Sequence, residues 1–83
     1  MTQAPGWYRG DVATIALGPC AARCVVRLVD GDRAQVQIGT DWTWVFTGEL
    51  QRTGEVLTWL PRSEWGWRRL GRIVAAIAPR DPS

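Results

Sequence analysis

Five residues of this sequence have side chains suited to a stacking site: Trp42, Trp65, Arg68, Arg69 and Arg72. The guanidinium group of arginine pairs with carboxylates or phosphates and lies flat against aromatic rings. On a helix, Trp65 would lie on the same side as the three arginines that follow it. An exposed aromatic ring beside arginines is the composition of a site for nucleic acid or for an acidic peptide. Three arginines on a helix are also the composition of an ordinary solvated face.

The sequence lacks the residues on which most catalytic sites depend. It contains no histidine, and all ten basic residues are arginine. Histidine triads, HExxH zinc sites, Schiff bases and phosphate-loop lysines are therefore excluded. The carboxylates are scattered beside turns or at the starts of elements, so their spacing predicts no acid/base pair. We expect no catalytic residue, no metal site and no cofactor.

The two cysteines, Cys20 and Cys24, are separated by three residues. Without histidine they cannot complete a four-ligand zinc site, and their spacing does not match a CxxC redox motif. In an extended strand they would lie too far apart for a disulfide, whereas a turn or helix would bring them within reach. We interpret both as small buried thiols in a reducing cytosol.

Six tryptophans in 83 residues are more than one small core can enclose. Each large aromatic side chain buries about 150–250 Å², and a chain of this length has little interior. Trp44, in the middle of its strand, and Trp59, in the apolar run VLTWL, are predicted core residues. Trp42 and Trp65 are predicted to be exposed. The surplus aromatic area indicates a homo-oligomer or a protein partner.

The elements that position these residues are mainly strands. The Asp30-Gly31-Asp32 sequence predicts a hairpin turn, and Trp42, Trp44 and Phe46 would share one face of a strand. A linker over residues 48–54 is predicted to contain one helical turn. Apolar and β-branched runs between turn residues predict strands over residues 10–17, 23–29, 33–39, 42–47 and 55–60.

The C-terminal segment, residues 63–78, is amphipathic at helical spacing. Ser63 is the predicted N-cap and Pro79 the predicted stop, while Gly66 and Gly71 each lower helix propensity. A final buried strand over residues 70–77 is the alternative, because a short apolar run is compatible with a buried strand and with a helix. The predicted apolar face of the helix comprises Trp67, Leu70, Ile73, Val74 and Ile77.

The length predicts a single domain over residues 1–83, with an N-terminal arm (1–8), a β-barrel (9–60) and the amphipathic segment. The formal net charge of +2 and pI of about 8.9 are far from those of a polycationic nucleic-acid binder. No apolar run reaches the roughly 20 residues needed to span a bilayer, and the N-terminus does not have the pattern of a signal peptide. We expect a cytoplasmic protein with no membrane contact.

Five short strands in a chain of this size predict a mainly β fold, a small open barrel with a short C-terminal helix. Over residues 9–52 the sequence resembles an SH3-like barrel of the Tudor or KOW type. The resemblance depends on Gly10-Asp11 at the first strand, the Asp30-Gly31-Asp32 hairpin, and Glu49-Leu50 after the tryptophan-bearing strand. Short motifs of this kind support a fold more than a function.

A second resemblance covers the same opening. Tyr8-Arg9-Gly10-Asp11-Val12, followed by Leu17-Gly18-Pro19, is similar to the first strand and loop of the MazF-like ribonuclease toxins, which also have an SH3-like barrel. Those proteins are longer and have an Arg-Pro pair at the start of the second strand, whereas here Arg23 precedes Cys24. The resemblance implies a catalytic role for Arg9 and Arg23 alone.

The sequence favours a small non-catalytic binding or assembly module that uses surface tryptophans and arginines. Its expected contact is with a protein partner or with further copies of itself. A nucleic-acid-binding barrel is the alternative. A MazF-like toxin, or an enzyme whose site forms at an oligomer axis, is a further alternative.

Overall fold

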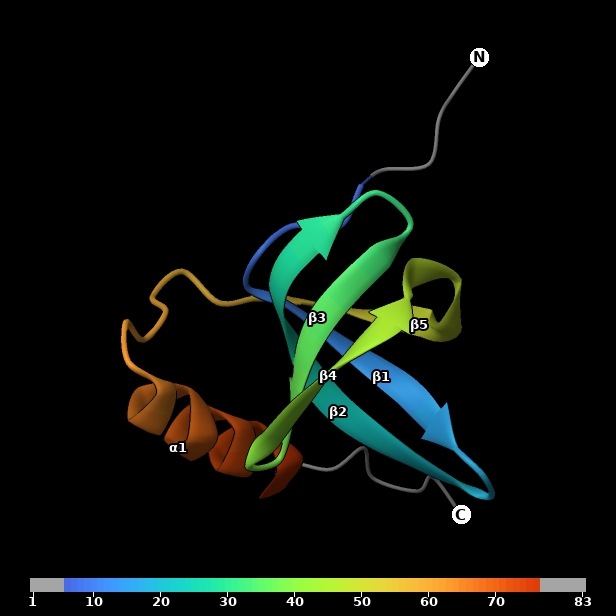
Figure 1. Ribbon diagram of the computed structural model, residues 1–83. Helices are drawn as coiled ribbons and strands as arrows, with labels where there is room; N and C mark the ends of the chain where they lie inside the picture. The colour runs from blue at the N-terminus through green and yellow to red at the C-terminus, as the bar shows by residue number, and fades with distance from the viewer. Residues whose placement is uncertain (1–5, 77–83) are drawn as a thin grey trace.

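The computed structural model describes residues 6–76 of the chain. It is mainly β, with five antiparallel strands in one open sheet and one C-terminal helix (Figure 1). The strands lie in the order β4-β3-β2-β1-β5, so β4 and β5 form the edges. Within these residues, no helix has the length and apolar character needed to cross a membrane. The elements are β1 (Asp11–Leu17), β2 (Cys20–Asp30), β3 (Arg33–Ile38), β4 (Asp41–Phe46), the 3₁₀ turn η1 (Thr47–Glu49), β5 (Leu50–Val56) and α1 (Glu64–Ala76).

The first four predicted strands are confirmed. The predicted linker over residues 48–54 begins in a helical turn, η1, but its residues 50–54 belong to β5, so the fifth predicted strand is misplaced. β5 begins at Leu50, directly after η1, and not at Glu55. Leu50 pairs with Ile15 and is buried, while most of β5 is exposed. Because an exposed edge strand carries polar residues, hydrophobicity does not reveal it. Residues 57–60, predicted as strand, belong to the connection between β5 and α1.

The three hairpins have two-residue turns with glycine at the first turn position. In the β3–β4 hairpin, Gly39 has φ +60° and the turn is closed by the pair Ile38 and Asp41. A positive φ at the first turn residue alone is the type II′ pattern, whose twist matches that of the strands. Gly18 and Gly31 occupy the same position in the other two hairpins. These turns fix the register of β1 to β4.

The central strands β1 and β2 are buried on both faces, so the core has two layers. Val12 and Val25 face the helix, while their neighbours Ala13 and Val26 face the opposite layer. The layer beneath α1 consists of Val12, Val25, Trp67 and Val74, with Leu57, Leu60 and Leu70 packed against it. The other layer consists of Ala13, Ile15, Cys24, Val26, Ala34, Val36 and Leu50.

The C-terminal segment is a helix, as predicted, and the strand alternative is wrong. The N–H of Gly66 donates to Ser63 Oγ at 3.0 Å, which confirms the predicted N-cap. Trp67 and Val74 are buried, but Ile73 is half exposed, so the buried stripe is narrower than predicted. Ile77 and Pro79 lie outside the described residues.

Gly71 brings α1 into close contact with the β3–β4 turn (Figure 1). A Cβ atom at this position would lie 1.9 Å from the carbonyl oxygen of Gly39. At Gly66, a Cβ would lie 2.7 Å from Pro61 Cβ. The two glycines that lower helix propensity therefore permit the close packing of the helix.

Candidate functional site

Three aromatic residues, Trp42, Trp44 and Phe46, form a strip on the outer face of β4 (the β4 strip). All three are exposed, and Trp44 retains 41% of its accessible surface. Val45, on the other face of the strand, pairs with Ala34 and packs against the core. The predicted strand phase is therefore correct, but the prediction that Trp44 is a core residue is wrong.

The small residues of the core layer on the side of the sheet away from α1 explain why Val45, and not Trp44, faces the core. Several residues of that layer on β2 and β3 are compact and have no exposed surface: Cys24, Ala34 and Val36. Because protein interiors are close-packed, the place beside Ala34 is filled by the compact side chain of Val45. The larger side chains of β4 therefore point outward.

The β4 strip continues across the sheet onto β2. Leu28 pairs with Gln35, and Gln35 pairs with Trp44, so these three residues share one face. Leu28 is half exposed. Arg33 lies over the Phe46 ring, with 5.9 Å from its guanidinium carbon to the ring centroid. The result is an exposed apolar surface on the outer side of β2, β3 and β4.

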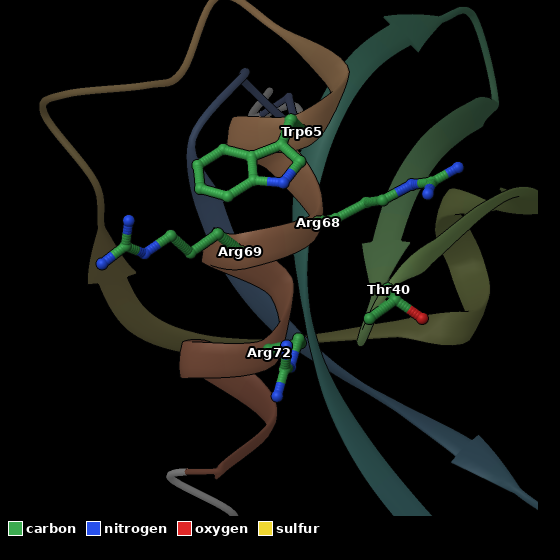
Figure 2. A pocket seen from close by; sticks show the side chains of 5 residues that line it. All are labelled: Thr40, Trp65, Arg68, Arg69 and Arg72. Atoms are coloured by element: carbon green, nitrogen blue, oxygen red, sulfur yellow. The ribbon is translucent and has the colours of Figure 1, made fainter.

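Four of the five predicted site residues lie together on α1. Trp65, Arg68, Arg69 and Arg72 line a hollow of about 580 Å³ with Thr40 of the β3–β4 turn. Trp42 belongs to the β4 strip instead. Figure 2 shows Arg68 and Arg69 extending to different sides of the Trp65 ring, with Arg72 one turn further along the helix. Trp65 is 69% exposed, as predicted, and the guanidinium carbon of Arg69 lies 5.6 Å from its ring centroid.

Trp65 also lines an apolar cleft of about 290 Å³. Trp59, predicted to be buried, is 74% exposed and lines this cleft, because it follows β5 in the loop before the helix. The hollow and the cleft share Trp65 and Arg69, and together they make the Trp65 groove. The remaining residues of the cleft are Pro61, Gly66, Leu70 and Ile73.

The three arginines of the Trp65 groove differ from Arg23 and Arg27 of the sheet. In the sheet, Arg23 pairs with Glu55, and Arg27 with Glu64. In residues 6–76, no ion pair or hydrogen bond joins Arg68, Arg69 or Arg72 to a carboxylate. Arg68 and the Glu64 carboxylate attract each other electrostatically without a hydrogen bond. Arg69 and Arg72 have no bonded carboxylate in this part of the chain, which favours the binding of an anion.

Arg27 connects the helix to the sheet, a role that sequence reasoning missed. Its guanidinium group donates to Gln37 Oε1 at 2.9 Å and forms an ion pair with Glu64 at the start of α1. It also lies 4.9 Å from the Trp67 ring centroid and 5.7 Å from that of Trp42. The hydrogen bond from Arg27 holds the pKa of the Glu64 carboxyl below its usual value. The sequence feature that could have indicated this role is the single arginine within the apolar run VVRLV.

Asp11 anchors the segment that precedes β1. Its buried carboxylate accepts a hydrogen bond from the N–H of Tyr8 at 2.9 Å. The same carboxylate forms an ion pair with Arg52 at 3.3 Å. Arg52 in turn lies 4.1 Å from the Trp7 ring centroid, and Trp7 packs against the core. The Gly-Asp pair of the SH3-like resemblance is thus a structural anchor here.

The cysteines are free and have different environments. Cys24 is buried, and burial raises its pKa to about 11. Cys20 is exposed at the β1–β2 hairpin, so the prediction of two buried thiols is wrong for this residue. Residues 6–76 contain no group of three or more Cys, Asp and Glu residues that could hold a metal ion.

The two arginines of the toxin resemblance lie in different settings. Arg9 is exposed in the turn before β1, whereas Arg23 of β2 is bound to Glu55. In the part of the chain that the structure describes, no hydrogen bond joins the two side chains.

Comparisons with protein-family models, with curated proteins and with solved structures give no match for this chain.

Proposed function

We propose that this protein is a non-catalytic assembly module that forms a homodimer by pairing β4 with β4 of a second copy. The observation that carries the proposal is the position of the β4 strip on an edge strand. In the described residues, β4 pairs with β3 alone, so its outer backbone groups are free. The strand sequence DWTWVF contains no lysine or proline, the residues that ordinarily protect an edge from pairing.

The register of the hairpin identifies the free backbone groups. Ile38 and Asp41 close the turn as a hydrogen-bonded pair, and alternate residues of a strand direct their N–H and C=O groups to opposite sides. Asp41, Thr43 and Val45 therefore bond to β3. The outward N–H and C=O groups belong to the residues of the β4 strip. Pairing with a second β4 would therefore give these groups hydrogen-bond partners and cover part of the aromatic side chains.

A two-fold axis at Trp44 gives the best register for this pairing. Trp44 would then lie opposite its own copy, and Trp42 opposite the partner's Phe46. Residues directly opposite in antiparallel strands share a face, so each of these pairs would be aromatic on aromatic. A two-fold contact of this kind is closed and self-complementary, which limits assembly to a dimer.

We also propose that the barrel is of the SH3-like Tudor or KOW type. Three observations support this assignment: Gly10-Asp11 opens β1, Gly31-Asp32 forms the middle turn, and Glu49-Leu50 joins η1 to β5. These are the positions on which the sequence resemblance depends. The assignment concerns the fold alone, and the proposed binding role depends on the β4 strip.

Light scattering coupled to size exclusion tests the dimer. At high micromolar concentration we expect twice the 9.3 kDa mass of the chain. The Trp44→Lys variant is expected to be monomeric, because the two-fold axis places the introduced lysine opposite its own copy and like charges repel. Trp44→Phe is expected to remain a dimer.

Trp59→Lys is the matched control, because Trp59 is an exposed tryptophan outside the β4 strip. Its dimer mass should equal that of the unmodified chain. A strict monomer at high micromolar concentration would refute the proposal. A dimer that Trp59→Lys dissociates and Trp44→Lys leaves intact would place the interface at the loop before α1, where Trp59 lies.

A further inference from the structure

The Trp65 groove has a cationic part and an apolar part that share one exposed indole ring. A ligand that fills both parts must have anionic groups beside flat apolar rings. We propose that the Trp65 groove binds single-stranded nucleic acid, with phosphates on the arginines and bases on the indole rings.

The cationic part brings three arginines together along one side of α1. Arg68, Arg69 and Arg72 contribute +3, whereas the formal net charge of the whole chain is +2. The rest of the chain is therefore nearly neutral. Because exposed guanidinium groups form bidentate hydrogen bonds to phosphate oxygens, three of them on one face favour a polyanion with repeated phosphates.

The spacing of the arginines suits consecutive phosphates. Arg68 and Arg72 are one helical turn apart, about 6 Å along the helix axis. Arg69 lies on the side of the apolar cleft, where it also contacts the Trp65 ring. A flexible backbone passing along the helix could thus contact all three guanidinium groups in sequence.

The apolar part provides surfaces for the bases. Trp59 and Trp65 both line the cleft, and both rings are more than two-thirds exposed. Stacking of a base on an aromatic ring does not depend on its identity, so binding would be tolerant of sequence. Duplex DNA keeps its bases stacked inside the helix and cannot use these rings, and an acidic peptide supplies the charges without the flat groups. The groove therefore favours a single strand over either.

Fluorescence anisotropy of a labelled dT₁₀ oligonucleotide tests the proposal. For three phosphate contacts, log K should fall with log salt concentration with a slope of about −2, since each contact to a single strand contributes about −0.7. The double variant Arg68→Gln, Arg72→Gln should reduce this slope to about −0.7. Trp65→Ala should weaken binding by about 5- to 150-fold and leave the slope unchanged.

Arg9→Gln is the matched control, because it removes one exposed positive charge outside the groove. Its affinity and slope should match those of the unmodified chain. No binding of dT₁₀ at low salt would overturn the proposal, as would equal loss of affinity in Arg9→Gln and in a single groove variant, Arg68→Gln. An affinity for a ten-residue polyglutamate or a ten-base-pair duplex equal to that for dT₁₀ would also overturn the proposal, because the indole rings would then contribute nothing to selecting the ligand.

Discussion

Trp67 is the single tryptophan that lies fully in the core, and the packing of α1 on the sheet depends on it. It retains 4% of its accessible surface and contacts Val12, Val25 and Val74 in the layer beneath the helix. Trp7 is half-buried, and the other four tryptophans are exposed. The indole rings of this protein thus divide into one structural residue, one partly buried residue and four that are available for contacts.

This division predicts different stability effects for two tryptophan substitutions. Trp67→Ala should lower the free energy of unfolding by about 3–5 kcal/mol, because it removes a buried ring and leaves a cavity. Trp44→Thr should cost less than about 1 kcal/mol in dilute solution, where Thr suits an exposed strand position. Thermal melts measured below the dimer dissociation range check both values. Equal destabilisation would show that the β4 strip is part of the core.

Sequence reasoning assigned some residues correctly and others wrongly for physical reasons. The exposure of Trp65 beside three arginines followed from helical phase, and the structure confirms it. Strand phase grouped Trp42 with Trp44 and Phe46 correctly, but phase does not tell which face of an edge strand is inside. The inward face of β4 depends on the volume of residues on neighbouring strands, such as Ala34 of β3, which pairs with Val45.

At the scale of elements, α1 is attached to the sheet by a small polar network. Arg27 of β2 contacts Glu64, Gln37 and two indole rings, and Gln37 Nε2 donates to the carbonyl of Gly39 at 3.0 Å. Gln37 is itself almost completely buried. Because a buried amide left without partners is costly, this network specifies how the helix docks.

The network predicts a pH dependence of stability. In the folded state the pKa of Glu64 is lowered, chiefly by the hydrogen bond from Arg27. Its stabilising effect is present above the ordinary glutamate pKa and is lost as the pH falls through the lower folded-state value. Urea unfolding should therefore show Glu64→Gln to be less stable than the unmodified chain at pH 7, with a smaller difference at pH 3. A difference that stays constant over this range would contradict an ionic role for Glu64.

The predictable part of the fold is the part with strong local signals. Glycine turns and alternating residues located β1 to β4, and the amphipathic pattern with Ser63 located α1. β5 was misplaced because its pairing with β1 is non-local and its own residues are mostly exposed. The apolar residues Leu57 and Leu60, which suggested a strand, instead pack beneath the helix. Their contacts depend on a helix far along the chain, which local pattern does not reveal.

At the scale of the whole molecule, the exposed aromatic residues fall on two separate surfaces. The β4 strip lies on the sheet, and the Trp65 groove lies on the outer side of α1. The two surfaces share no residue, so each has its own substitutions that leave the other in place.

Amide hydrogen exchange of β4 at two protein concentrations tests the proposed assembly most directly. In the dimer, the outward N–H groups of Trp42, Trp44 and Phe46 would bond to the second copy. We predict that these three amides are protected at high micromolar concentration and exchange rapidly after dilution, while the amides of Thr43 and Val45, bonded to β3, stay protected in both. Rapid exchange of the three amides at both concentrations would contradict pairing through β4.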